Sequence, residues 1–211
     1  MSGNSKHSEI HPPRRRQTNE TGQAFIAAAT TLFAEKGFNG TSIGDLANQL
    51  GLTTASLYYH VSGKQELLLR VLEDGMSNFL NRLEEVVQEA VEPREKIRLA
   101  VENHLQFVLT NKQEVAVFLR ERRFLESPLR ESYDARVNRY DHLFTEVIRE
   151  GMAAGTVPPG DPTLLRLAIL GMINWIVEWY DPRGRLSIAE IKAEMTDLIM
   201  ERILAVPSSS A

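Results

Sequence analysis

Cysteine is absent from the 211-residue chain. Its absence excludes a disulfide-stapled scaffold, a thiolate metal site and a cysteine nucleophile, and it fits a reducing compartment. Long apolar runs are also missing, because the longest one, residues 164–177, is too short to span a bilayer and includes Arg166 and Asn174. The N-terminus carries no apolar segment of the kind that directs secretion. These absences predict a cytoplasmic protein that makes no contact with a membrane.

The sequence has no strand pattern, no internal repeat and no heptad array. Apolar residues recur at helical spacing in every segment after residue 18, which predicts an all-α fold of about nine helices. Catalytic signatures are lacking as well, since neither a Gly-rich phosphate loop nor a Ser/His/Asp arrangement is apparent. We therefore predict no catalytic residue, no metal site and no cofactor, and an all-α enzyme is a distant alternative.

Positive charge is scarce overall, and the formal net charge is −4. Seven Lys or Arg and five Asp or Glu fall in residues 1–70, against seventeen and twenty-three in residues 71–211. A basic excess at one end of an otherwise acidic chain is consistent with a nucleic-acid contact confined to that end. Residues 1–17 lack periodic apolar residues and are predicted to form a disordered basic arm that reaches DNA, with a solubilising tail as the alternative.

Residues 41–64 carry the signals of two short helices joined by a tight turn. An apolar stripe at helical spacing follows Ser42, whose hydroxyl can form a capping box with Asp45. Gly51 is suited to end this helix, and Thr53 is placed to cap the next one. Two helices around a Gly-containing turn form a helix-turn-helix, whose second helix lies in the DNA major groove. An amphipathic hairpin without a DNA role is the alternative.

The second helix, residues 54–60, has an unusual outer surface. Leu57 faces the core, and the outward positions hold small hydroxyl and methyl groups, two adjacent tyrosines and a histidine. Such groups bond phosphates, pack on sugars or touch base edges. Ser62 and Gln65 repeat the capping signal for a third helix, at whose start Lys64 is placed to share a phosphate with backbone N–H groups.

Two strings between Phe25 and Leu69 are distinctive, Ala-x-x-Leu-Phe-Ala-x-x-Gly-Phe-x-Gly-Thr-Ser-Ile and Gly-Leu-Thr-Thr-Ala-Ser-Leu-Tyr-Tyr-His-Val-Ser-Gly-Lys-Gln-Glu-Leu. Together they closely resemble the DNA-binding domain of TetR-family transcriptional regulators. The resemblance implies that Thr54, Ala55 and Tyr58 face bases. It also implies that Thr41, Tyr59, His60 and Lys64 contact the DNA backbone. The complete predicted set of DNA-binding residues is Thr41, Thr53, Thr54, Ala55, Tyr58, Tyr59, His60, Lys64, Arg14, Arg15 and Arg16.

The first domain, residues 18–64, is predicted to close where a long helix begins and runs to about residue 90. Because this helix belongs to both domains, tilting it would move the recognition helix. Residues 65–205 are predicted to form a helical ligand-binding and dimerisation domain, and residues 206–211 a disordered tail.

The eighth predicted helix, residues 162–180, is apolar nearly all round and must therefore be buried on every side. One side can face its own domain and the other requires a partner, with a fully enclosed central helix as the alternative. The resemblance implies that the last two helices form a four-helix dimer interface, to which we assign Leu167, Gly171 and Leu198. A C2 homodimer would present two recognition helices to successive major grooves, about 34–36 Å apart, on a palindromic operator.

Polar residues on otherwise buried stripes predict an apolar cavity with a few polar anchors. His104 lies on one such stripe, and Asn174 lies beside a tryptophan. Each alone also fits a satisfied core group. The predicted ligand-binding residues are His104, Phe118, Arg122, Tyr140, Asn174, Trp175 and Glu178.

Arginines between residues 120 and 139 crowd one region. Pairing with acidic neighbours, such as Glu126 with Arg122 and Arg130, is the default, and a phosphate-binding patch at the mouth of the pocket is the alternative. The later string Leu-Gly-Met-Ile-Asn-Trp-Ile-Val-Glu-Trp-Tyr-Asp-Pro-Arg-Gly-Arg-Leu-Ser-Ile-Ala-Glu-Ile is similar to that in TetR-type regulators of fatty-acid and steroid breakdown. Several of those regulators respond to acyl-coenzyme A (acyl-CoA) thioesters.

Together these observations predict a transcriptional repressor that binds operator DNA as a homodimer and is released by a small hydrophobic effector, such as an acyl-CoA thioester. A TetR-type regulator of drug or efflux genes that senses a non-CoA hydrophobic compound is the alternative. A structural DNA-bending protein is more distant, because it would not need an acidic body of this size. An all-α enzyme is also distant, because no catalytic arrangement is apparent.

Overall fold

The computed structural model describes residues 14–206. The predicted arm and tail extend beyond this range, so residues 1–13 and 207–211 lie outside the described part. The elements in chain order are α1 (Arg14–Gly40), α2 (Ile43–Gln49), α3 (Thr54–His60), α4 (Lys64–Gln88), α5 (Pro93–Thr110), α6 (Lys112–Glu121), a 3₁₀ turn η1 (Arg122–Phe124), α7 (Leu129–Ala153), α8 (Pro162–Asn174), α9 (Ile176–Trp179), α10 (Ile188–Asp197) and a π-helical turn η2 (Leu198–Ile203).

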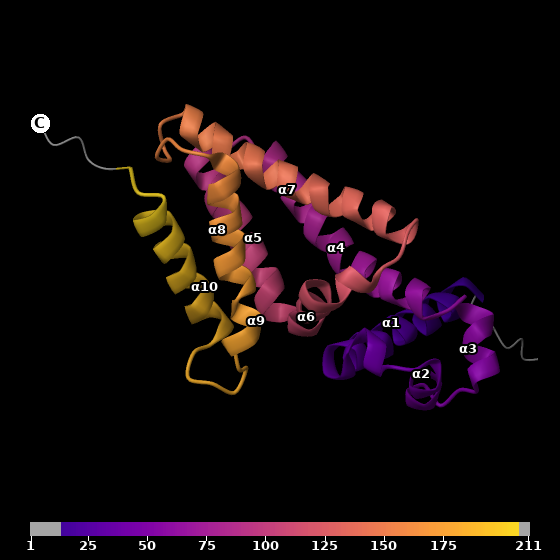
Figure 1. Cartoon of the computed structure of the whole chain (residues 1–211). Helices are drawn as coiled ribbons and strands as arrows, with labels where there is room; N and C mark the ends of the chain where they lie inside the picture. The colour runs from indigo at the N-terminus through magenta and orange to yellow at the C-terminus, as the bar shows by residue number, and fades with distance from the viewer. Residues whose placement is uncertain (1–13, 207–211) are drawn as a thin grey trace, which may run out of the picture.

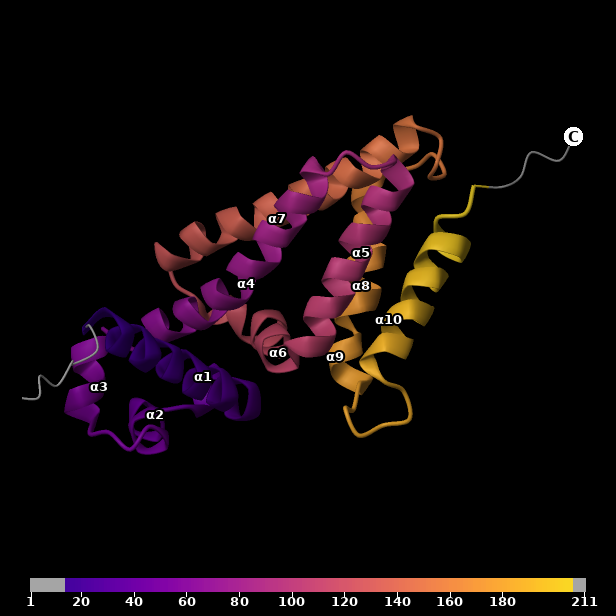
Figure 2. The same cartoon turned by 180° about the vertical axis from the view of Figure 1, so that it is seen from behind.

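The described residues form helices and no β-strand, which confirms the predicted all-α fold. A small helix-turn-helix domain, α1 to α3, is followed by a larger helical domain. Figure 1 shows α3 at one end of the molecule and α10 at the other. The view from behind in Figure 2 agrees, with α10 lying along the outer side of α5.

Local capping shapes the helix-turn-helix. Asp45 N–H donates to Ser42 Oγ (3.0 Å) and Ser42 N–H donates to Asp45 Oδ2 (2.8 Å), which is the predicted capping box. The hydroxyl and backbone hydrogen bonds from Ser42 hold the pKa of Asp45 below its ordinary value. Gly51 adopts a φ of 66° between the two helices, and Thr53 Oγ1 accepts a hydrogen bond from Ser56 N–H (3.1 Å) at the start of α3.

Two helix starts differ from the prediction. α1 begins earlier, at Arg14, so the backbone of the three arginines assigned to the arm is helical, while their side chains lie outside the described part. α4 is capped by Gly63, because Ser62 donates through N–H and Oγ to Glu66 Oε2 (2.6 and 2.7 Å). Gln65 does not cap the helix, since its amide donates to a backbone carbonyl of η1 instead (2.9 Å).

One continuous hydrophobic core runs through both domains. Phe25 and Leu57 are buried in the N-terminal domain, and Leu68 and Val71 of α4 continue the core into the larger domain. α4 packs on α1 as well as on α5 and α7. Each such side chain stabilises the fold by roughly 1.5–3 kcal/mol when fully buried. A tilt of α4 therefore displaces packed side chains in both domains.

The predicted eighth helix is divided, which raises the number of α-helices in the described part to ten. α8 ends at Asn174, Trp175 forms its C-cap with N–H bonded to Gly171 O (3.1 Å), and the short α9 follows. Within residues 14–206, no helix combines the length and the apolar character that crossing a membrane would require.

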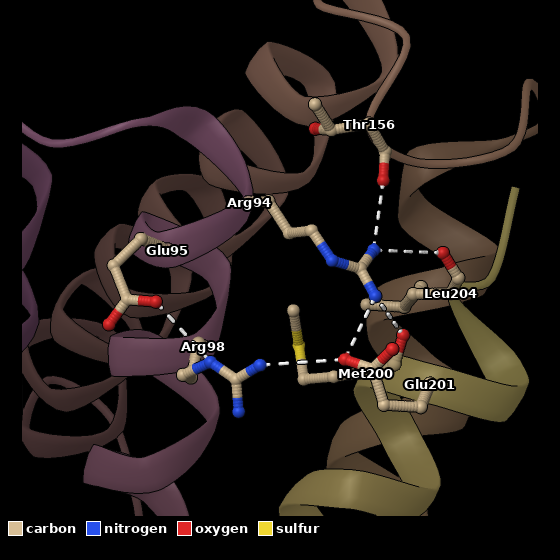
Figure 3. Close-up of polar contacts among 7 residues, drawn as sticks. All are labelled: Arg94, Glu95, Arg98, Thr156, Met200, Glu201 and Leu204. Atoms are coloured by element: carbon tan, nitrogen blue, oxygen red, sulfur yellow. Dashed lines mark hydrogen bonds and ion pairs between the residues drawn. The ribbon is translucent and has the colours of Figure 1, made fainter.

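Arg94 at the start of α5 ties the last helix of the chain to the rest of the domain (Figure 3). Its Nη2 donates to Met200 O (2.6 Å), and its Nη1 donates to the carbonyl oxygens of Thr156 (3.1 Å) and Leu204 (3.3 Å). Glu201 adds an ion pair at 3.1 Å. Because the last carbonyls of a helix have no partner within it, a guanidinium at this end pairs them and complements the helix dipole.

Candidate nucleic-acid interface and ligand cavity

α3 presents most of the predicted DNA-binding side chains to solvent. Tyr58 and Tyr59 are 54% and 88% exposed, and Thr54 and Ala55 at the start of the helix are exposed as well. His60 ends the helix, and its ring packs against an aromatic ring of α1 with the centroids 5.1 Å apart. Side chains that can donate, accept and stack thus share one exposed surface, as contact with phosphates, sugars and base edges requires.

Two predicted contacts with the DNA backbone are used inside the domain instead. Thr41 is buried, and its hydroxyl donates to the carbonyl oxygens of Gly37 (2.9 Å) or Leu32 (3.2 Å). Lys64 Nζ donates to the carbonyl oxygens of Phe38 (2.7 Å) and Thr41 (2.9 Å). The Thr41 side chain therefore has no further donor for a phosphate, contrary to the prediction. Lys64 has three N–H groups on its ammonium, so one of them is still available to donate to a phosphate.

A cavity of about 280 Å³ lies between α4, α5, α6, α7 and α8. Its wall is mainly aromatic and aliphatic, with Phe79, Phe107 and Val137 contributed by three of these helices. Five of the predicted ligand-binding residues line it: His104, Phe118, Arg122, Tyr140 and Asn174. A mainly apolar hollow with a few convergent polar groups is the usual form of a small-molecule site.

Trp175 and Glu178 lie outside this cavity, so the prediction is wrong for both. Trp175 is 65% exposed, and Glu178 accepts a hydrogen bond from Arg120 (2.6 Å) on the surface. Consecutive residues of a helix point about 100° apart. Since Asn174 lines the cavity, its neighbour Trp175 is turned toward solvent.

A chain of hydrogen bonds runs along the cavity wall. His104 Nδ1 lies 2.8 Å from Tyr140 Oη, and His104 Nε2 lies 3.0 Å from Asn174 Oδ1. Burial lowers the pKa of His104 to about 4 and raises the pKa of Tyr140 well above its ordinary value. Both side chains are therefore uncharged at neutral pH. Because the amide oxygen only accepts, the imidazole proton resides on Nε2 and the tyrosine hydroxyl donates to Nδ1.

The cavity wall also contains an ion pair that sequence analysis did not assign to it. Arg166 Nη1 on α8 lies 2.6 Å from Asp141 Oδ1 on α7, and both side chains line the cavity. The one available signal was the position of Arg166 within an apolar helix, since a buried charge requires a partner. The acid that pairs with it stands on a different helix and has no sequence signature of its own.

Comparison with known proteins identifies the family. Residues 25–71 match the family model for bacterial regulatory proteins of the tetR family, and residues 90–203 match the model for the tetracyclin repressor-like C-terminal domain. The second match alone covers more than half of the chain. The chain belongs to the TetR family. This TetR-family protein is a DNA-binding transcriptional regulator and not an enzyme, as predicted.

Individual TetR-type regulators are similar over most of their length. The HTH-type transcriptional repressor KstR2 of Mycolicibacterium smegmatis is 24% identical over 177 residues, which cover 83% of this chain and 86% of that protein. The fatty acid metabolism regulator protein of Bacillus subtilis is 23% identical, covering 84% of this chain and 93% of its own length. A crystal structure of AibR in complex with isovaleryl coenzyme A and operator DNA is 30% identical with a TM-score of 0.78, and covers 84% of this chain and 97% of AibR.

In this TetR-family chain, a surface hollow lined by three arginines adjoins the cavity. Arg122, Arg123 and Arg130 line the hollow together with Asp134, and Arg122 lines the cavity too. Arg122 donates through Nε and Nη2 to Asp134 Oδ1 (3.1 and 2.7 Å), whereas Arg130 donates to backbone carbonyl oxygens. The predicted pairing of these arginines with Glu126 is therefore wrong, because α7 supplies a better-placed carboxylate to Arg122.

One face of α8 and α9 carries an apolar stripe that the described residues leave uncovered. Leu167 and Trp175 are 55% and 65% exposed, and Gly171 and Trp179 are exposed at the same helical spacing. No side chain of the described residues lies within 4 Å of a Cβ built on Gly171. Two of the three predicted interface residues, Leu167 and Gly171, thus lie on this stripe, and Leu198 is partly buried in η2.

The end of α6 docks onto the DNA-binding domain. Phe38 N–H donates to Glu121 Oε2 (2.7 Å), and the Phe38 ring stacks on Phe124 of η1 with the centroids 5.8 Å apart. Gln65 Nε2 donates to Phe124 O (2.9 Å). α6 also lines the cavity, so the same helix contacts both the cavity and α1 of the DNA-binding domain.

Proposed function

We propose that this regulator is a repressor that binds a palindromic operator as a homodimer and is released by a small hydrophobic effector, an acyl-CoA thioester. The observation that carries the proposal is the position of the cavity. Its walls include α6, which docks on the DNA-binding domain, and α8, which carries the exposed apolar stripe. A molecule in the cavity would touch both elements that set the orientation of the DNA-binding domain.

The proposed DNA contact runs through α3. Thr53, Thr54 and Ala55 are small residues at the N-terminal end, where they let the helix approach base edges closely. Tyr58 and Tyr59 extend beyond them and can donate to phosphates. Two copies of α3 in a homodimer would meet successive major grooves, about 34–36 Å apart, which requires a palindromic site.

The proposed dimer interface is the stripe on α8 and α9. Leu167, Trp175 and Trp179 present large apolar surfaces to solvent, and contiguous patches of this kind commonly mark interaction sites. Gly171 in the middle of the stripe leaves room for a partner helix to approach closely. Because α8 lies far from α3 in the molecule, pairing through this stripe leaves both α3 helices uncovered (Figure 1).

An acyl-CoA thioester fits the chemistry of the cavity and the adjoining hollow. The apolar cavity suits an acyl group, and arginines at the hollow suit phosphate, which guanidinium groups bind in a planar, bidentate manner. AibR has been crystallised with isovaleryl coenzyme A, and the relative from Bacillus subtilis is a regulator of fatty acid metabolism. These likenesses support the same class of effector for this chain.

The proposed release follows from two conformations with different affinities for the effector. A ligand that fits the cavity better when α6 and α4 are displaced shifts the population toward that state. The displaced state separates the two α3 helices by a distance that no longer matches the operator. The effector and the operator then oppose each other's binding by the same coupling free energy.

The test is fluorescence anisotropy of labelled DNA from upstream of this protein's own gene, titrated with protein in the presence and absence of acyl-CoA thioesters. We expect saturable binding that a thioester reverses and free coenzyme A does not. Operator binding that no thioester affects would favour a regulator that senses a non-CoA hydrophobic compound. Binding without sequence preference would contradict the operator-specific repressor.

A further inference from the structure

Arg166 is a charged side chain in an otherwise apolar part of α8. The exposed fraction is 8% for the whole residue and 10% for the side chain, so the side chain is nine-tenths buried. Nη1 lies 2.6 Å from Asp141 Oδ1, but Nε has no hydrogen-bond partner among residues 14–206. Buried donors in folded proteins are nearly always paired. Arg166 also lines the cavity, so a bound molecule can offer an acceptor to the part of its side chain that faces the cavity.

The charges around Arg166 decide which kind of acceptor fits. Among the described residues, four charged side chains line the cavity, namely Glu114, Arg122, Asp141 and Arg166, so positive and negative charges balance. Asp141 already neutralises Arg166, and Asp134 pairs with Arg122. A carboxylate brought into this cavity would be a buried charge without a free counterion. A neutral carbonyl oxygen accepts the same hydrogen bond without that penalty.

The other polar groups of the wall are largely occupied with one another. His104 uses both ring nitrogens in its contacts with Tyr140 and Asn174. The N–H groups of Asn174 remain, but this residue stands eight positions after Arg166 on α8, about 12 Å along the helix axis. An acceptor near Arg166 therefore meets the guanidinium and not the amide.

We propose that Arg166 anchors the effector by donating a hydrogen bond to a neutral carbonyl oxygen, the thioester carbonyl, while Asp141 holds the guanidinium in place. This inference rests on the proposed function and names the group of the effector that the cavity recognises. A neutral carbonyl anchor also predicts which ligand the protein selects. The protein binds a thioester and rejects the free carboxylic acid of the same chain, because the carboxylate adds a charge that the cavity cannot balance.

Isothermal titration of the full-length protein with matched probes tests this. Saturated thioesters from butanoyl- to palmitoyl-CoA identify the best chain length, and the S-alkyl-CoA thioether of that length then supplies the same molecule without a carbonyl oxygen. We expect the wild type to prefer the thioester by roughly ten- to a hundredfold, as for one hydrogen bond to a charged group. In the double variant Arg166→Met with Asp141→Leu, which removes the pair together, the preference falls to about one, with thioether affinity retained.

The control variant Arg149→Met with Glu146→Leu removes an exposed ion pair from α7 and should keep the wild-type preference. If the Arg166/Asp141 variant keeps the thioester preference, the assignment of the anchor to Arg166 is overturned, but the proposed effector class is not. A wild type that binds neither probe overturns the proposed effector class, and this inference with it. A wild type that binds the free fatty acid as tightly as the thioester also overturns the inference, and that comparison does not depend on how the variants fold.

Discussion

Glu121 and Arg122 are consecutive residues whose side chains face different parts of the molecule. Glu121 Oε2 accepts a hydrogen bond from Phe38 N–H in the DNA-binding domain (2.7 Å), and Arg122 lines the cavity in the larger domain. The 3₁₀ turn that begins at Arg122 ends α6 between these two contacts. One peptide unit therefore separates a contact with the DNA-binding domain from a residue of the cavity wall.

Removing the Glu121 carboxylate should weaken this link. In Glu121→Leu the buried Phe38 N–H loses its acceptor, so we expect a loss of about 1–3 kcal/mol in the free energy of unfolding. The release of operator DNA by effector should also shrink several-fold. Glu121→Gln keeps an acceptor oxygen and serves as the matched control with a smaller effect. Thermal unfolding and anisotropy measure the two quantities, and a Leu variant with wild-type release would contradict the coupling.

Tyr58→Ala should weaken operator binding without affecting the fold. Tyr58 is 54% exposed on α3, so its removal leaves the core intact, while the loss of one phosphate or base contact raises the operator Kd roughly tenfold. His142→Ala on α7 alters an exposed ring far from α3 and is the control. Anisotropy gives the Kd, and thermal unfolding checks the fold. Equal operator affinity in the variant and the wild type would remove Tyr58 from the contact surface.

Gly171→Glu should convert dimers into monomers. The new carboxylate would stand in the middle of the apolar stripe, where pairing of two subunits would bury it without a counterion. Gly160→Glu is the matched control, because Gly160 also has open space around it but lies in the loop before α8. Light scattering coupled to size-exclusion chromatography reports the mass. If Gly171→Glu stays dimeric, the interface lies elsewhere.

His104 should make the protein less stable in mild acid. Burial lowers the pKa of His104 to about 4 in the folded protein, while the unfolded value is about 6.5, so the unfolded state binds the proton more readily between these values. Stability is therefore lost as the pH falls through this window, by about 2 kcal/mol at pH 5. Urea unfolding at pH 7 and pH 5 should show this extra loss in the wild type and not in His104→Gln. An equal pH dependence in both proteins would contradict the buried neutral state.

Much of the helix-turn-helix could be predicted from residues that lie close together in the sequence. The Ser42–Asp45 capping box and the Thr53 cap of α3 depend on atoms three residues apart, so the sequence alone contains both partners. The start of α4 differs from the prediction, because Ser62 bonds Glu66 and a carbonyl of η1, far along the chain, accepts the hydrogen bond of the Gln65 amide. Local pattern alone cannot foresee such competition.

The cavity was predicted from its polar residues and only partly correctly. His104 and Asn174 stood out as polar residues on apolar stripes, and the structure brings them together. Trp175 was misassigned because it follows Asn174 directly and therefore points about 100° away from the cavity, toward solvent. The Arg166–Asp141 pair joins two helices whose relative register depends on the packing of the whole domain, and no spacing rule gives that register.

α8 is one helix thick, and Leu167 and Gly171 belong both to the cavity wall and to the exposed stripe. In a dimer formed through that stripe, each cavity would be separated from the other subunit by this single helix. An effector that moves α8 on one side would then change the surface on which the partner's α8 rests. We therefore expect the two cavities to fill cooperatively, with a Hill coefficient different from one, so that the steepness of the response is set by the same helix that binds the effector.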